Sequence, residues 1–281
     1  MVWAQREVRA LRNADREQAL AVCAREPAAG VYVAARIGET DLDRARGVLL
    51  GYAPHGPVEA VCWASANFVP VGCDEAAASA FAHRLRRQQS QCSSIFGPAM
   101  EVAWMWDTLS SRWREPIELR VPQPLMAIPV DRTLRVAPDP RLRPATPADL
   151  DVLTPAAAAM FTEEIGYPPY RDQRGLRAYR GAVRALVGRG HAFVITEGDT
   201  VVFKADIGSV GVGACQIQGV WIDPAFRGQG IAAAAMAAVV QRARRVAPLV
   251  TLYVNHYNAA ALATYRRVGF DEIGRFATIL F

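Results

Sequence analysis

The sequence predicts an α/β protein in which helices flank mixed, twisted β-sheets, divided between two units of related architecture. Runs typical of strands alternate with runs typical of helices along most of the chain. The order and spacing of these runs are alike in the two halves. With 281 residues, of which 52% are hydrophobic, the chain is long enough to form two domains with substantial cores.

A proline-rich stretch near the middle of the chain marks the expected boundary between the units. Proline has no amide hydrogen to donate and interrupts helices, so a dense group of prolines favours a connecting segment. We place the boundary near residue 138, which gives an N-terminal domain of residues 1–137 and a C-terminal domain of residues 138–281. The prolines are at positions 122, 124, 129, 138, 140, 144 and 147.

The N-terminal unit is expected to begin with a short strand and the start of a helix in VRALRNADREQAL, with Asn13 as the N-cap. A long β-like run, a helix, a short strand, a second helix and a further strand follow. Their expected ranges are 58–71, 74–90, 93–96, 99–112 and 117–121.

The C-terminal unit opens in the same way, with LRPATPADLDVL. Thr146 is the expected N-cap, Pro147 suits the first helical position, and Asp149 stands where a capping box has an acidic residue. Strand, helix, strand, helix and strand then alternate to the end of the chain. Their expected ranges are 214–223, 230–246, 249–255, 258–268 and 271–280.

Charge and hydrophobicity argue against nucleic-acid binding and membrane insertion. The formal net charge is +5, and Lys204 is the only lysine, so arginine carries nearly all the positive charge. A modest positive field suits an anionic ligand, whereas nucleic-acid binding would need a concentrated basic stripe with aromatic residues. The longest apolar run, GIAAAAMAAVV, has about half the ~20 residues of a membrane-spanning helix.

Cysteine usage and the first residues indicate the compartment. The opening segment MVWAQREVRALR has no apolar core of a signal peptide. The 5 cysteines are scattered and form no CxxC pair, which favours reduced thiols over disulfides or a metal site. We therefore expect a cytoplasmic protein without a metal.

The stretch WIDPAFRGQGIAAAA, residues 221–235, joins a β-like run to an alanine-rich helix. Gly228 and Gly230 can adopt positive φ and, without a Cβ, let a ligand approach the main chain. The helix that follows begins with unpaired N–H groups and a partial positive charge, to which Arg227 adds a full charge. The stretch therefore predicts an anion site suited to a phosphate or pyrophosphate.

Two common phosphate-binding motifs fit this stretch poorly. A Walker loop needs a lysine directly after its second glycine, and Lys204 lies far from the loop. A dinucleotide-binding turn has its first glycine directly at the strand end, whereas here residues 223–227 intervene. That fold also wants an acidic residue at the end of the next strand, where this chain has Asn255.

The pattern R-x-x-G-x-A, formed by Arg227, Gly230 and Ala232, resembles the pyrophosphate loop of the GNAT N-acetyltransferase superfamily. The later segment NHYNAAALATYRRVGF is similar to that family's second acyl-CoA segment. The resemblance covers roughly residues 140–281, and its details resemble the glycine N-acyltransferase-like branch. The first half looks like an uncharacterised domain found ahead of such domains, and we expect it to be a degenerate GNAT-like unit without a cofactor loop. It has no R-x-x-G-x-G loop, and Asp74 and Glu75 would repel a pyrophosphate there.

The resemblance implies acetyl-CoA, or another acyl-CoA, as cosubstrate and an amine as the second partner. It implies that the pantetheine arm pairs with the strand, that the pyrophosphate lies on the loop amides, and that two asparagines and a tyrosine contact the cofactor. The implied cofactor-binding residues are Val220, Trp221, Ile222, Arg227, Gly228, Gln229, Gly230, Ile231, Ala232, Ala233, Asn255, Asn258 and Tyr265. Asn258 is equally suited to be the N-cap of its own helix.

The resemblance also implies direct attack of the amine on the thioester, with Tyr265 giving a proton to the departing thiolate and an amide near Val220 binding the oxyanion. The strand position that often carries a catalytic glutamate is Gln216 in this chain. Glu163 and Glu164, expected in a helix–helix loop near the acceptor site, are the leading candidates for a general base.

Several alternatives stay open. Asp206 and His256 are weaker candidates for the base, and ordered water could deprotonate the amine. Because Gln216 replaces an acid, a non-catalytic acyl-CoA-binding regulatory module is the alternative to an N-acetyltransferase. The sequence leaves open the acceptor and the oligomeric state.

Overall fold

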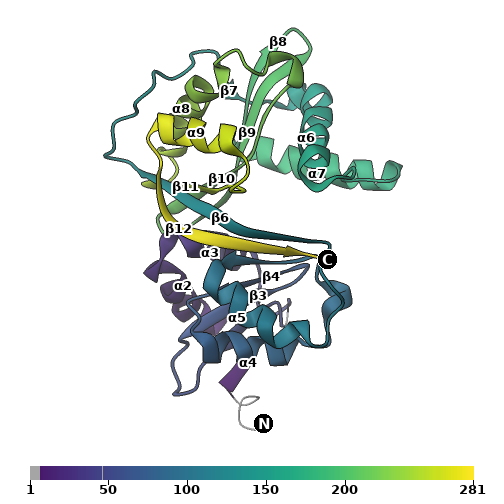
Figure 1. The fold of residues 1–281 in the computed structure, drawn as a ribbon, viewed down its shortest axis with the longest axis vertical. Helices are drawn as coiled ribbons and strands as arrows, with labels where there is room; N and C mark the ends of the chain where they lie inside the picture. The colour runs from purple at the N-terminus through teal and green to yellow at the C-terminus, as the bar shows by residue number, and fades with distance from the viewer. Residues whose placement is uncertain (1–6, 46) are drawn as a thin grey trace.

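A computed structural model describes residues 7–45 and 47–281. Its strands form one mixed sheet of 12 strands, covered by helices on its faces, as Figure 1 shows. The predicted α/β class with a mixed sheet is confirmed. The strand order is β1-β2-β3-β4-β5-β12-β6-β11-β10-β9-β8-β7.

The order is symmetric about the centre of the sheet. Each half of the chain contributes an antiparallel group of strands, then a parallel pair with a helix between its members. That pair is β4 and β5 in the N-terminal half and β10 and β11 in the C-terminal half. The N-terminal elements are β1 (Val8–Ala10), α2 (Arg16–Arg25), α3 (Pro27–Glu39), β2 (Leu49–Tyr52), β3 (Ala60–Ala64), β4 (Asn67–Val71), α4 (Glu75–Leu85), β5 (Ser94–Pro98), α5 (Ala99–Ser110) and β6 (Glu118–Pro129).

The C-terminal half repeats this order. Its elements are β7 (Arg143–Pro144), α6 (Leu150–Ile165), α7 (Gln173–Gly188), β8 (Ala192–Glu197), β9 (Thr200–Gly211), β10 (Ala214–Ile222), α8 (Ile231–Ala243), β11 (Leu249–Tyr253), α9 (Ala259–Val268) and β12 (Asp271–Leu280). The last five of these agree closely with the expected ranges. Single-turn 3₁₀ helices precede several α-helices, among them Asn13–Asp15, Pro147–Asp149 and Pro224–Phe226.

The two predicted helix starts have different outcomes. The capping box of Thr146 and Asp149 is present, with Pro147 at the first helical position. The prediction of Asn13 as an N-cap is wrong, because Arg12 occupies that position and its amide donates to Asp15.

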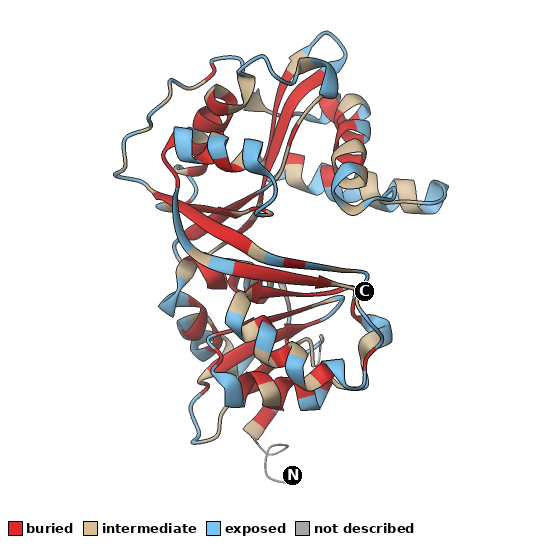
Figure 2. Cartoon of the chain, viewed as in Figure 1, coloured by how far each residue is buried: buried red, intermediate tan, exposed pale blue. Residues whose placement is uncertain are grey.

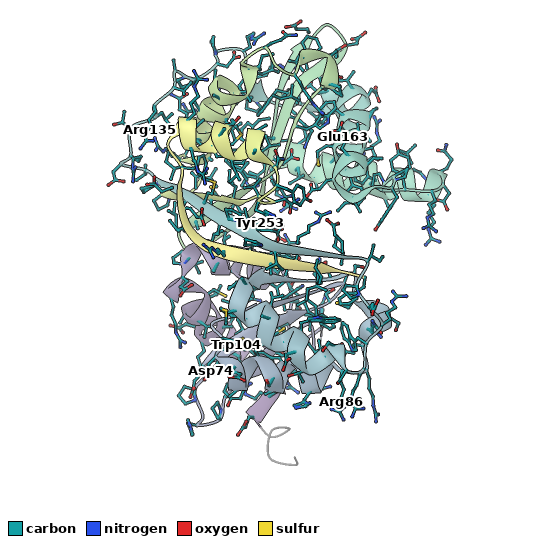
Figure 3. All side chains as sticks on the ribbon, in the orientation of Figure 1. Asp74, Arg86, Trp104, Arg135, Glu163 and Tyr253 are labelled. Atoms are coloured by element: carbon teal, nitrogen blue, oxygen red, sulfur yellow. The ribbon has the colours of Figure 1, made fainter. Side chains whose placement is uncertain are left out.

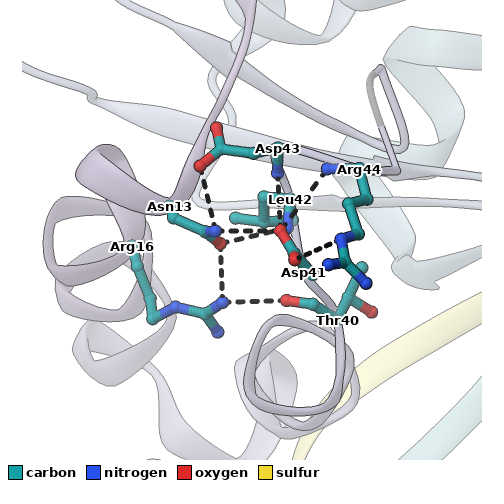
Figure 4. Close-up of polar contacts among 7 residues, drawn as sticks. All are labelled: Asn13, Arg16, Thr40, Asp41, Leu42, Asp43 and Arg44. Carbon is teal, nitrogen blue, oxygen red and sulfur yellow. Dashed lines mark hydrogen bonds and ion pairs between the residues drawn. The ribbon is translucent and has the colours of Figure 1, made fainter.

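The Asn13 side chain instead ties the helix start to the loop after α3, as Figure 4 shows. Its amide group donates to Asp41 and Asp43, and its oxygen accepts from the amide of Leu42 at 3.0 Å. Asn13 thus stabilises the packing of a loop rather than a helix end.

The two halves exchange their last strands. β6 pairs with β11 of the C-terminal half through Leu125–Pro129, and β12 pairs with β5 of the N-terminal half through Phe276–Leu280. β6 and β12 also pair with each other along most of their length, and Figure 1 shows them crossing the middle of the molecule side by side. The proposed division at residue 138 therefore separates two halves that are joined in one sheet.

Each exchanged strand buries its C-terminal part in the other half, as the red segments of β6 and β12 in Figure 2 show. Met126 and Ile128 of β6 belong to the core formed by β9, β10, β11 and α8. Ala277 and Ile279 of β12 belong to the core formed by β3, β5, α4 and α5. Neither core is complete without a strand from the other half.

Across the described residues, no helix combines the length and apolarity that crossing a membrane requires.

The exchange predicts that side chains of β12 stabilise the N-terminal half. Ile279 is 3% exposed within that core, so Ile279→Ala should lower the free energy of unfolding by about 2–5 kcal/mol. Ile273 lies on the same strand but is 52% exposed, and Ile273→Ala should change it by less than about 0.5 kcal/mol. Denaturant titration followed by tryptophan fluorescence measures both. Equal effects of the two substitutions would contradict the packing described here.

Candidate functional site

A cleft opens where the parallel strands β10 and β11 diverge. The two strands pair only from Ala214 to Gln216 on β10, opposite Leu249 to Thr251 on β11. Beyond that point lies a cavity of about 580 Å³. Its walls come from α6, α7, β9, β10, β11 and α9, together with Gln123 from the exchanged strand β6. In Figure 3, Tyr253, which lines the cavity, lies just above the crossing strands, and Glu163 marks the α6 side.

The loop predicted to bind an anion connects β10 to α8. Asp223 caps the 3₁₀ turn Pro224–Phe226, accepting from the amide of Ala225. Gly228 and Gly230 have φ of 78° and 77°, a conformation that favours glycine, and both are exposed. No side chain caps the start of α8 at Gly230, so its first N–H groups are available to a ligand.

The alanines of α8 hold the helix against the sheet. Ala235 and Ala237 are fully buried, and Ala233 is 8% exposed. Ala233 lies in the first turn, so the open helix end rests on a rigid, closely packed base. The loop is therefore presented at one side of the cleft by a helix that has little freedom to move.

Arg227 does not lie free in this loop. Its Nε donates to the carbonyl of Ile222 at 3.0 Å, and its guanidinium pairs with Glu163 at 2.6 Å. The other oxygen of Glu163 accepts from the indole of Trp221 at 3.0 Å. Glu163 thus connects the loop and the end of β10 to α6.

Glu163 and Glu164 lie in the last turn of α6, not in the loop where we expected them. The helix ends at Gly166, with φ of 88°. Glu164 contacts Arg120 of β6, which bonds its carboxylate at 3.4 Å and its carbonyl at 2.8 Å. Arg120, only 4% exposed, also pairs with Glu118. Both candidate bases are therefore paired with an arginine.

The strand that should align an acyl arm contains a bulge. Gln218 is opposite Asp206 of β9, but the next matched pair is Trp221 with Lys204, so Gly219 and Val220 lie outside the register. Gly219 has φ of 60°. Val220 and Trp221 line the cavity, and their predicted contact with the cofactor stays a prediction.

A buried ion pair at the cleft was missed from the sequence. Lys204 Nζ donates to Asp206 Oδ2 at 2.6 Å and to the carbonyl of Gly219 at 2.8 Å. Lys204 is 1% exposed and Asp206 7%. Two charged residues spaced by one position on an otherwise apolar strand face the same side, and that signal could have identified them.

The second predicted ligand segment borders the same cavity. Asn255 accepts from Gln123 of β6 at 2.8 Å, and Gln123 accepts from Thr278 of β12 at 2.6 Å. The Asn258 oxygen caps α9 by accepting from Ala261 at 3.1 Å, while its amide nitrogen stays available. Both asparagines line the cavity.

Tyr265 lines the cavity from α9. The residue is 7% exposed, and its ring packs against Phe270 with centroids 5.9 Å apart. Burial raises the pKa of its phenol above the ordinary value, an effect to which the charge of Glu164 adds. Tyr265 therefore stays protonated at physiological pH and can act as a proton donor.

The structure also places Gln216, which stands where a catalytic glutamate is often found, and His256, a weaker candidate for the base. Gln216, 4% exposed, lines the floor of the cavity, where its amide cannot accept a proton. The Nδ1 atom of His256 lies 3.1 Å from the carbonyl of Pro122, and His256 does not line the cavity. In the part of the chain that the structure describes, no group of three or more His, Cys, Asp or Glu residues could hold a metal ion.

Comparisons with known proteins show which family the chain resembles. The model of the acetyltransferase (GNAT) family matches residues 156–270. A domain of unknown function, DUF4081, matches residues 47–153. The N-alpha-acetyltransferase RimI of Mycobacterium tuberculosis is 31% identical over 133 residues, which cover 46% of this chain and 77% of that protein. The closer likeness to the glycine N-acyltransferase-like branch stays a prediction.

Two solved structures share the fold over nearly the whole chain. A GCN5-related N-acetyltransferase from Sphaerobacter thermophilus is 17% identical with a TM-score of 0.63, covering 97% of this chain and 94% of that one. A tandem GNAT protein from the clavulanic acid biosynthesis pathway is 13% identical with a TM-score of 0.60, covering 97% of each chain. The predicted arrangement of two GNAT-like units is confirmed by these likenesses. On its sequence relatives and its fold, the chain belongs to the GNAT acetyltransferase family.

Proposed function

We propose that this protein is an N-acetyltransferase that moves an acetyl group from acetyl-CoA to a primary amine. The observation that carries the proposal is the open glycine loop at the start of α8, placed beside the cleft that the divergence of β10 and β11 opens. A loop of free N–H groups suits the pyrophosphate of CoA, and the cleft beside it suits the acyl arm.

The cofactor would lie along one side of the cleft. The amides of residues 227–233 would hold the pyrophosphate, and the free edge of β10 at residues 220–222 would pair with the pantetheine arm. Asn255 and Asn258 each use their oxygen within the protein, which leaves their amide nitrogens as donors toward the arm.

The thioester supplies an acyl carbon that the amine nitrogen attacks, so a C–N bond forms and the C–S bond breaks. Tyr265 would donate its phenolic proton to the departing sulfur. The proton lost by the amine would leave through water. Val220 would supply its amide to the oxyanion.

Among the described residues, each carboxylate that lines the cleft is paired with a cation, so none is free to act as a base. The three carboxylates that line the cavity, Glu163, Glu164 and Asp206, are paired with Arg227, Arg120 and Lys204. An amine acceptor must then become neutral largely without help. An α-amino group, with a pKa near 8, is neutral about two orders of magnitude more often at pH 7.5 than an alkyl amine with a pKa near 10.4. The structure therefore favours an α-amine, and the likeness to an N-alpha-acetyltransferase points the same way.

Acetyl-CoA binding should depend on the charge at position 227. Arg227→Glu would set a carboxylate against both the pyrophosphate and Glu163, and calorimetry should show acetyl-CoA affinity reduced by about 10²-fold or more. Arg245→Glu makes the same charge change at an exposed position beyond the other end of α8 and should leave affinity within about threefold. Failure of the wild-type protein to bind acetyl-CoA would refute the proposed function.

Tyr265→Phe should lower kcat by about 10²-fold and leave acetyl-CoA affinity nearly unchanged, because the phenol is needed when the sulfur departs. The raised pKa adds a pH prediction: thiol-release rates of the wild type should not decline through loss of this proton below about pH 10. Wild-type kcat retained in the variant would exclude Tyr265 as the acid.

The acceptor class can be tested with a matched pair of peptides. One has a free α-amine and no lysine, and the other has a blocked α-amine and one lysine. Thiol release at pH 7.5 should be about 10²-fold faster with the first. A preference for the lysine peptide would contradict the α-amine proposal. Acetyl-CoA binding without thiol release with any amine would instead support the regulatory module, which Gln216 and the paired carboxylates also favour.

A further inference from the structure

The buried pair of Lys204 and Asp206 stands directly beneath the bulge of β10. Lys204 Nζ reaches Asp206 Oδ2 at 2.6 Å and the Gly219 carbonyl at 2.8 Å. Removing two charges from water carries a desolvation cost that their attraction often fails to offset, so such a pair is weak evidence for stability. The second hydrogen bond of Lys204, to the backbone of the bulge, points to a role beyond stability.

The pair and the bulge fit closely. A Cβ added to Gly219 would lie 2.9 Å from Lys204 Nζ and 3.0 Å from Asp206 Oδ2. Gly219 also has φ of 60°, which an L-residue adopts reluctantly. A glycine therefore lets the bulge carbonyl meet the ammonium group without a steric clash.

The contact determines where the next amide points. The only cis peptide bond in the described chain is Val121–Pro122, so the Gly219–Val220 peptide is trans and its C=O and N–H point in opposite directions. A side chain from β9 holds the carbonyl on one edge of β10. We therefore expect the Val220 N–H on the other edge, where β11 pairs no further than Gln216.

We propose that Lys204 is a positioning residue that aims the Val220 amide into the cleft as the hydrogen-bond donor to the thioester carbonyl, with Asp206 holding the ammonium in place. The inference rests on the proposed function. The ammonium also polarises the peptide group, which strengthens its N–H as a donor. A preorganised donor acts where negative charge develops on the carbonyl oxygen.

The test uses the full-length protein and acetyl-CoA labelled with ¹³C at the carbonyl. Difference infrared spectroscopy reports the hydrogen bond as a red shift of the thioester stretch on binding, and calorimetry gives Kd. Thiol release without an added amine, with water as acceptor, gives kcat. Lys204→Met/Asp206→Leu removes both charges together, so that neither the ammonium nor the carboxylate is left buried without its partner. It also removes the donor to the Gly219 carbonyl.

We expect the double variant to lose the red shift and about 10²-fold in kcat, with Kd within about threefold of the wild type. Thr251→Val is the matched control, because Thr251 is also fully buried and donates to a carbonyl of β10, that of Cys215, away from the bulge. It should keep the red shift and kcat even if its melting temperature falls.

A folded double variant with the wild-type red shift and kcat would overturn the role of Lys204 while leaving the proposed function intact. Absence of acetyl-CoA binding by the wild type would overturn both. Should the double variant fail to fold, Lys204→Gln retains a neutral donor of similar length. It should show an intermediate red shift and kcat with Kd unchanged, and a full wild-type shift would refute the proposal.

Discussion

The pairing of β6 with β12 is the constraint on which the rest of the structure depends. The two strands join the halves into one sheet, and each completes the core of the half to which it does not belong in sequence. The exchange also shapes the cleft, since Gln123 of β6 holds Asn255 and Arg120 of β6 holds Glu164. The wall of the candidate site thus depends on a strand from the other half.

The charges at the cleft follow a common rule. Each carboxylate that lines it forms an ion pair. Glu164 pairs with Arg120 of β6, Asp206 with Lys204 of the same strand β9, and Glu163 with Arg227 of the loop. For the buried charges of Arg120, Lys204 and Asp206 the lack of a partner would be costly, and each pair also connects the elements that carry it. Glu163 and Glu164, which we first considered as bases, connect α6 to the loop and to β6 through these pairs.

Local features of the sequence predicted the fold class, the last five helices and strands of the C-terminal half and the glycine loop, whereas α7, β8 and β9 were not predicted. The strand exchange was not predictable, because pairing between distant segments leaves no local pattern. The prolines at 122 and 124 pointed away from a central strand, since proline cannot donate to a ladder. They are accommodated because the ladder of β11 with β6 starts at Leu125, and beside it Pro124 only accepts, through its carbonyl, from the amide of Val254 at 3.2 Å. The pairs of Arg227 with Glu163 and of Arg120 with Glu164 were hidden for the same reason, because their partners are far apart in the chain. Lys204 and Asp206 are only two positions apart, so that pair could have been identified.

The N-terminal half has a helix in the place that corresponds to α8, but a side chain caps its start. Its α4 occupies the place after β4 that α8 occupies after β10, but Asp74 caps it by accepting from Ala77 at 2.8 Å. Asp74 is labelled in the lower half of Figure 3, away from Glu163 in the upper half. A carboxylate already placed at that helix end satisfies a free N–H and repels a phosphate, whereas Gly230 leaves the start of α8 open. The N-terminal half therefore contributes to the candidate site through β6 and its side chains, and of the two helix starts only that of α8 is open to the proposed pyrophosphate.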